Sequence, residues 1–175
     1  MSAPFDANNA QNLVDIEKQF AVKAVEHAQT YWNLLEKVDP KDLRLSKLDD
    51  DIFDHFKREF PENFEEPYEH ITKLNEESMK SKEGKEKWRK FIESYKDTVK
   101  DYNFGSLIRT DARDEYSEKN TIFTTRIQFY AFEIARNRLG LNAKAHEIAK
   151  KEAEKEKAKA EKAKEKGKSK SNGKS

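Results

Sequence analysis

The chain of 175 residues contains no cysteine, which excludes several kinds of chemistry. Disulfide bonds, thiolate nucleophiles and cysteine-based zinc sites all need thiol groups. Glycine and proline are also scarce, with five and four residues. An all-β protein with many tight turns needs more of both, so the composition favours helices.

Long apolar runs are missing as well. No segment approaches the roughly 18 continuous apolar residues that a membrane span needs. Residues 1–6 (MSAPFD) contain neither the basic region nor the apolar core of a signal peptide. We therefore expect a cytoplasmic protein without membrane contact. Nuclear import through the lysine-rich C-terminal segment stays open.

The charged residues that are present are unevenly distributed. Residues 143–175 hold 12 lysines and six acids, a net charge of +6. Residues 1–142 hold the other 23 bases and 28 acids, a net charge of −5. An acidic body favours a basic partner, and a basic tail favours an acidic one. Solubility alone explains the pattern equally well.

Apolar residues recur three or four positions apart through most of the chain, which is typical of amphipathic helices. Pro40 and Pro61 bar simple continuation of the first two helices. Residues 106–116 are predicted to form an ordered, partly extended connector. The predicted helices cover about residues 10–38, 46–60, 66–79, 88–102 and 117–139.

These helices predict an all-α fold, a single compact domain of about five helices with a flexible C-terminal tail rich in Lys, Glu and Ala. We expect a disordered N-terminus over residues 1–9, the helical domain over 10–142, and a charged tail over 143–175 that is partly helical and then disordered. Ile148 is the one large aliphatic residue of the tail, so we expect the tail to pack against no core.

Motifs for catalysis are weak in this sequence. Asp50, Asp51 and Asp54 spell D-D-x-x-D, which holds magnesium in some diphosphate enzymes, but a second acidic motif is missing. Acids in the first turn of a helix are expected from the helix dipole alone. The four histidines fall in separate segments, and no nucleotide-binding or nucleophile motif occurs. We expect no enzyme activity, no metal and no cofactor.

A set of polar residues stands out in the most apolar third of the chain. Glu133 lies within one helical turn of Arg136 and two turns from Arg126. Such groups are costly to bury unless they are paired. Two alternatives follow: an internal ion-pair network that braces the connector against the helix, or a polar docking face for a partner.

Five segments carry a specific resemblance. They are NFGSLIR (103–109), Tyr116, NTIF (120–123), RIQF (126–129) and EIARNR (133–138). Together they closely resemble the polysaccharide biosynthesis domain-containing protein 1 family, and the chain is similar to a fungal member over residues 10–142. Leu139 departs from the animal pattern, where an acid is usual.

The resemblance implies a dedicated chaperone for translation elongation factor 1-alpha, acting on the nascent or newly made GTP-binding domain. The ribosome or nascent-chain machinery is a further implied partner, and we expect a monomer without specific nucleic-acid binding. Alternatives are an enzyme or accessory protein of polysaccharide biosynthesis, and a ribosome- or RNA-associated protein that acts through the basic tail. The candidate partner-binding residues are Arg109, Tyr116, Asn120, Arg126, Gln128, Glu133, Arg136, Asn137 and Arg138.

Overall fold

The computed structural model describes the backbone of residues 7–172 and the side chains of residues 18–171. Most of the predicted disordered N-terminus, residues 1–6, lies outside this range, and residues 7–9 open the first helix. The elements in chain order are α1 (Ala7–Lys37), a 3-10 turn (Pro40–Asp42), α2 (Asp49–Glu59), a 3-10 turn (Pro61–Phe64), α3 (Glu69–Thr72), α4 (Glu76–Lys80), α5 (Lys82–Glu93), β1 (Gly105–Arg109), β2 (Thr121–Thr125), α6 (Arg126–Arg138) and α7 (Ala143–Asn172).

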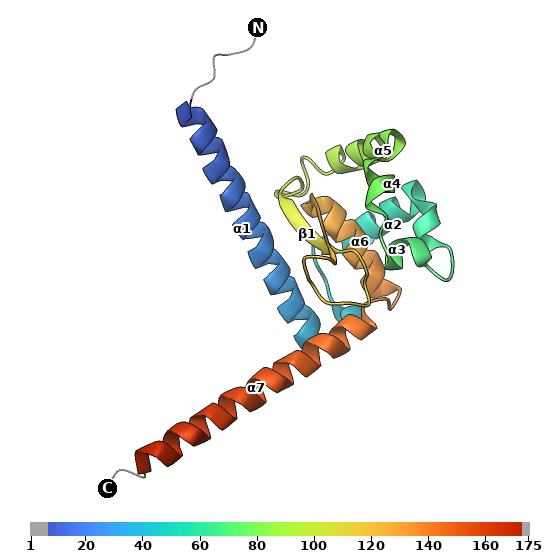
Figure 1. Ribbon diagram of the computed structural model, residues 1–175. Coiled ribbons are helices and arrows are strands. Elements are labelled where there is room, and N and C mark those ends of the chain that lie inside the picture. Colours follow the sequence, from blue (N-terminus) through green and yellow to red (C-terminus); the bar gives the residue numbers. More distant parts are fainter. Residues whose placement is uncertain (1–6, 173–175) are drawn as a thin grey trace.

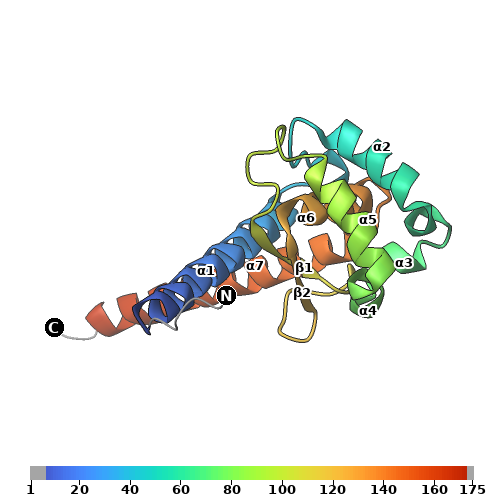
Figure 2. The same cartoon turned by 90° about the horizontal axis from the view of Figure 1, so that it is seen from above.

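Helix α6 occupies the centre of the fold (Figure 1). Ten of its residues are buried, from Ile127 to Asn137. On one side lie α2 to α5, and on the other lie α1, α7 and the two strands, as the view from above also shows (Figure 2). Because α6 contacts both layers, it has no polar face turned to solvent, unlike an ordinary surface helix.

Aromatic side chains fill the space between α6 and the α2–α5 layer. Phe56 of α2 packs edge-on against Phe132 of α6 at 5.3 Å between ring centroids. Trp88 of α5 stacks on Phe60 at 4.2 Å and also contacts Phe132. Such pairs add about 0.5–1.5 kcal/mol each beyond the area they bury. This cluster anchors the short helices, which have little stability of their own.

The all-α prediction is wrong, because the protein has an α+β fold. Strands β1 and β2 pair antiparallel, with Leu107 opposite Phe123, and form a two-stranded sheet against α1 and α6. The residues 121–125 (TIFTT) are four β-branched residues and one phenylalanine, which favour an extended chain. Ile122 and Thr124 face inward, whereas Phe123 faces outward.

The central helix therefore starts at Arg126, nine residues after the predicted start near Ser117. Thr125 ends the strand and caps the helix: its hydroxyl accepts the backbone N–H of Gln128, and the Gln128 side chain accepts the N–H of Thr125. This reciprocal capping box fixes the strand-to-helix corner. The helix predicted over residues 88–102 is shifted, since α5 begins at Lys82 and ends at Glu93, with turns after it. The helix predicted over residues 66–79 is divided into the short helices α3 and α4.

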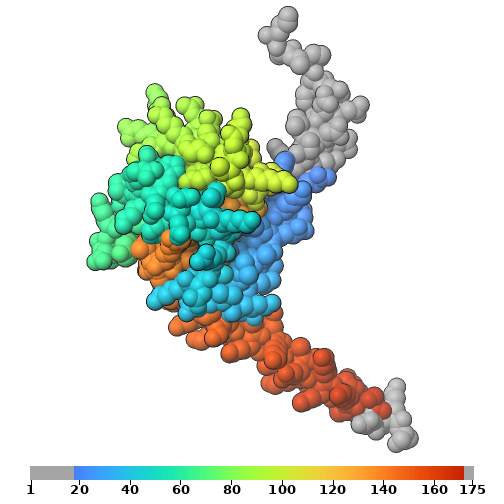
Figure 3. Space-filling view, turned by 180° about the vertical axis from the view of Figure 1, so that it is seen from behind, coloured from blue at the N-terminus to red at the C-terminus, as the bar shows by residue number. Residues whose placement is uncertain are grey.

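The structure describes the charged tail as the long helix α7 up to Asn172. Its first turns pack against α1, contrary to the expectation that they would contact no core. Ala145 and Ala149 are fully buried, and the His146 imidazole bonds to the carbonyl oxygen of Leu35. Beyond these turns the helix extends away from the body (Figure 3). Mobility of that outer part stays a prediction.

No helix within residues 7–172 has the length and apolar content to cross a membrane.

Candidate functional site

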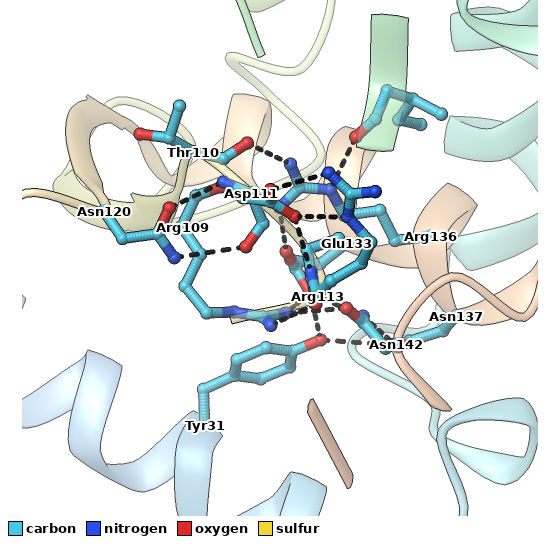
Figure 4. A network of polar contacts seen from close by, with 12 residues as sticks. Tyr31, Arg109, Thr110, Asp111, Arg113, Asn120, Glu133, Arg136, Asn137 and Asn142 are labelled. Carbon is cyan, nitrogen blue, oxygen red and sulfur yellow. Dashed lines mark hydrogen bonds and ion pairs between the residues drawn. The ribbon is translucent and has the colours of Figure 1, made fainter. Parts of the chain in front are cut away.

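The predicted polar cluster converges on one carboxylate in the centre of the fold (Figure 4). The Glu133 side chain on α6 pairs with Arg136 one turn later, at 2.9 Å, and with Arg109 of β1, at 3.3 Å. All three side chains are fully buried. The structure thus shows the internal ion-pair network, the first of the two alternatives.

Two further side chains bond to Glu133, and Asn137 holds both of them in place. The Tyr31 hydroxyl of α1 donates to Glu133 Oε2 at 2.5 Å, and the Asn142 amide donates to the same oxygen at 2.9 Å. Asn137 in turn donates to Tyr31 and accepts from Asn142. The buried carboxylate accepts four hydrogen bonds in all, as a buried charge requires.

Arg136 and Arg109 also donate N–H groups to backbone carbonyls, while Arg109 Nε is buried without a hydrogen-bond partner. Arg136 donates to the carbonyl oxygens of Ile71, Arg109 and Thr110, at 2.8–3.1 Å. Arg109 donates to the carbonyl of Ala112 at 2.8 Å. The network therefore joins α1, the end of α3, β1, the following loop, α6 and the start of α7.

The network is ionised at neutral pH. Burial alone would raise the pKa of Glu133, but the positive charges of Arg109 and Arg136 outweigh it and hold that pKa below its usual range. Burial raises the pKa of the Tyr31 phenol well above its ordinary value, and the Glu133 charge adds to this. Tyr31 is therefore a fixed hydrogen-bond donor to an ionised acceptor.

The other predicted residues lie around this centre and serve local structure. Asn120 is buried, and its amide donates to the carbonyls of Asp111 and Glu115, which holds the loop between the strands. Arg126 pairs with Asp101 at 2.8 Å and is mostly buried. Gln128 forms the capping box described above.

Tyr116 and Arg138 are the predicted residues nearest to solvent. Tyr116 is half-buried and donates to the carbonyl of Leu107 at 3.1 Å. Arg138 is exposed, pairs with Asp50 at 2.6 Å and lies over the ring of Phe53. Partner binding through any of the nine residues stays a prediction.

The three aspartates of the D-D-x-x-D motif lie on α2, and Asp50 and Asp51 are in its first turn. Among residues whose placement the structure describes, no three His, Cys, Asp or Glu residues are grouped closely enough to hold a metal ion. The neighbouring Asp49 accepts the backbone N–H groups of Leu45 and Ser46 at 2.8 and 2.7 Å, a helix-start role.

Comparison with known proteins decides the family. The family model described as "PBDC1 protein" matches residues 16–147, about three quarters of the chain and all of the network. The chain belongs to the PBDC1 family. It is 54% identical to the "Protein PBDC1 homolog" of Saccharomyces cerevisiae, over 79% of this chain and 93% of that one.

Other PBDC1 relatives extend this likeness. The chain is 43% identical to human "Protein PBDC1", over 85% of this chain and 61% of that one. A solution NMR structure of protein yst0336 from Saccharomyces cerevisiae superposes with a TM-score of 0.71 at 51% identity, covering 83% of this chain and 98% of that one. The α+β architecture is therefore shared with an experimentally solved relative.

Two surface features of this PBDC1 family member were not predicted. The first is a groove of about 640 Å³ between α1, α7 and the loop from β1 to β2. Its floor includes Trp32 and Tyr116, whose rings meet edge to face at 6.1 Å. Five glutamates line it, and we call it the acidic groove: Glu36, Glu115, Glu118, Glu152 and Glu156.

The second feature is a hollow of about 570 Å³ between the start of β1, the end of β2 and α1. Phe20 and Phe123 are 48% and 61% exposed there, and Gly105 lies between them in its lining. We call these three residues the aromatic patch. A side chain at Gly105 would collide with the Phe123 ring, since an added Cβ would lie 2.4 Å from its Cζ.

Sequence reasoning missed both features for physical reasons. Glu152 and Glu156 sit in a segment that reads as a solvated tail, although Ala149 and Ala153 mark a small-residue face at helical spacing. That small-residue face was the sequence signal that this part of the tail packs against the body. Phe123 was assigned to the core because the segment was read as a helix. Tyr31 lies 102 residues from Glu133, so no local pattern links it to the network. Asn142 is only nine residues from Glu133, but it follows the end of the helix, where helical spacing no longer places it.

Proposed function

We propose that this protein is a chaperone that binds translation elongation factor 1-alpha, nascent or newly made, on its GTP-binding domain. The client is the one that the family resemblance of the segments NFGSLIR and EIARNR implies. The proposal includes a monomeric, cytoplasmic protein that catalyses no reaction and needs no cofactor of its own. Its contact with the ribosome or nascent-chain machinery belongs to the same proposal.

The observation that carries the binding part is the aromatic patch. Large apolar side chains exposed side by side are typical of sites that bind another apolar surface. Phe123 stands on the outward face of β2, and Phe20 on α1 faces the same hollow. An incomplete GTP-binding domain exposes apolar segments that later become buried, and such a segment can cover this patch until the domain is complete.

The two strands that carry part of the aromatic patch are attached to the central helix α6. β2 runs directly into α6, and α6 holds the buried Glu133 network. Arg136 donates to the carbonyl of Arg109, so β1 is tied to the same helix. A preformed binding surface loses less conformational entropy when a client binds than a mobile one does. The network therefore supports binding by fixing the hairpin, without touching the client.

A capture assay with the freshly translated GTP-binding domain of elongation factor 1-alpha tests this proposal. Phe123→Thr keeps the strand preference of the residue and removes the exposed ring. We expect it to weaken capture of freshly translated domain at least about tenfold, a loss of about 1.4 kcal/mol. Leu34→Gln, an exposed apolar residue on α1 outside the patch, is the matched control. Equal capture by all three proteins would contradict the proposal.

A further inference from the structure

The acidic groove has a rigid aromatic floor. The Trp32 indole N–H donates to Glu152 Oε2 of α7 at 3.3 Å, and the Tyr116 hydroxyl is bound to the carbonyl of Leu107. The Arg109 guanidinium lies beneath both rings, 5.8 and 5.9 Å from their centroids. The two rings are thus held from below and from the side, and they keep the groove open.

The negative charge of the groove is not neutralised by the protein. None of the described residues that line it is a lysine or an arginine. None of the ion pairs between described residues involves its five glutamates. On α7 the groove is lined by Ala149, Glu152, Ala153 and Glu156, which share one helix face, so the lysines of α7 point elsewhere.

The carboxyl groups of Glu115 and Glu152 lie close enough to affect each other's protonation. A hydrogen bond to Glu152 and the charge of that residue raise the pKa of Glu115 above its ordinary value. The groove therefore holds closely spaced negative charge that a cation from outside would stabilise. The body of the chain has the same sign, with a net charge of −5 before residue 143.

We infer that the acidic groove is a docking site for a basic segment of another protein, one that carries Lys or Arg beside aliphatic side chains. The carboxylates at the rim match the charge, and Trp32 and Tyr116 supply faces for the cation and for its apolar stem. A volume of about 640 Å³ accommodates several side chains. Phosphate backbones are repelled by the same carboxylates, so the site does not fit nucleic acid.

This site is separate from the aromatic patch, although both border α1. The patch contacts α1 at Phe20, whereas the groove contacts it from Val25 to Glu36. The inference does not depend on which client the protein serves, because it stands on the charge and shape of the groove. Its test contains no elongation factor, so the two proposals fail independently.

Fluorescence anisotropy with the full chain tests the inference. The probe is a labelled peptide of about twelve residues with three repeats of Arg-Leu-Lys-Ser, and the reference peptide has Glu at every Arg and Lys. We expect saturable binding of the basic peptide, weaker at high salt, and a shift of Trp32 emission that Trp32→Phe removes. Absence of saturable binding below about 1 mM, or equal binding of the acidic peptide, would overturn it.

Matched variants distinguish binding of the peptide in the groove from nonspecific electrostatic attraction to the acidic protein. Glu36→Lys, Glu118→Lys and Glu156→Lys combined should weaken binding at least about tenfold, because they reverse the charge at the site. Glu65→Lys, Glu77→Lys and Glu86→Lys change the net charge equally on exposed positions outside the groove, and should change binding less than about twofold. An equal loss of peptide affinity in both sets of variants would overturn the inference.

Two more results complete the test. If the Lys variant is unfolded by circular dichroism, the corresponding Gln variant removes the same charges without reversal, and its unchanged affinity would overturn the inference. Sedimentation of the free protein checks the remaining occupant. If the parent protein is a dimer and the Gln or Lys variant is a monomer, the lysine-rich α7 of a second copy fills the groove. That result would overturn the inference of a basic segment from another protein.

Discussion

The hydroxyl of Tyr31 donates to the carboxylate of Glu133 at 2.5 Å, across 102 residues of sequence. This bond joins α1 to the central helix at the point where Arg109 and Arg136 also meet. Helix α1 also bonds to α7 through Trp32 and Leu35 and to β1 through His27. The Tyr31 bond is the one that ties α1 to the buried ion-pair network.

Glu133→Gln should destabilise the fold by about 3–5 kcal/mol, because it leaves two buried arginine charges without their partner. Denaturant unfolding followed by circular dichroism measures the change. Glu147→Gln removes the same charge from an exposed position of α7 and should cost less than about 0.5 kcal/mol. A loss below about 1 kcal/mol for Glu133→Gln would show that the network contributes little.

Tyr31→Phe should cost about 1–2 kcal/mol, a smaller loss, since Glu133 keeps three other donors. Hydrogen exchange of α1 amides should also increase more than that of α6 amides, because the bond tethers α1. Equal protection of α1 in the variant and the parent would contradict the tethering role.

Acid should weaken the fold in two windows. Burial and the neighbouring charge of Arg126 lower the pKa of His27 to about 4, so the unfolded chain binds a proton between pH 6.5 and about 4 that the folded chain does not. Stability should therefore fall as pH drops through this window. His27→Gln should flatten the slope there, while His70→Gln, at an exposed position, should keep it.

The second window belongs to Glu133. Its pKa is lower in the folded state, so its ionised form contributes stability that is complete above the usual glutamate pKa of 4.5 and is lost as pH falls through the lower, folded-state pKa. Unfolding midpoints below pH 4.5 should fall less steeply for Glu133→Gln than for the parent. Parallel curves would contradict the ionised state of this carboxylate.

Two truncations should separate the parts of α7. Removing residues 157–175 leaves Ala145, Ala149 and the acidic groove in place, so folding and client capture should stay near parent values. Removing residues 143–175 uncovers α1 and should cost about 2 kcal/mol or more, from the buried alanine methyls and the His146 contact. If the shorter deletion abolishes client capture, the lysine-rich residues 157–175 carry the binding, contrary to this proposal.

The sequence predicted the helical stripes well where both the period and the stops were clear, as at Pro40 and Pro61. It also predicted that Glu133, Arg136 and Arg109 needed partners, because charges in an apolar segment are costly to bury. The hairpin was missed because residues 117–125 continue the helical spacing of Ile122 and Ile127, while the β-branched content of TIFTT decided otherwise.

Apart from the small-residue face of Ala149 and Ala153, the sequence carries no signal for the surface features. Trp32, Glu115 and Glu152 come together from three distant segments, and nothing local links them. Trp32 of α1 and Glu152 of α7 are brought together by the packing of these two helices, to which the buried Ala145 and Ala149 contribute. Charge totals did indicate an acidic body, but not where on the body the acids gather.

The proposed function is protection of the GTP-binding domain of elongation factor 1-alpha during its synthesis. The most direct measurement is the soluble fraction of that domain made by cell-free translation, with and without the purified protein. We predict a higher soluble fraction with the parent protein and with Leu34→Gln, and no gain with Phe123→Thr. An equal soluble fraction with and without the parent protein would contradict this proposal.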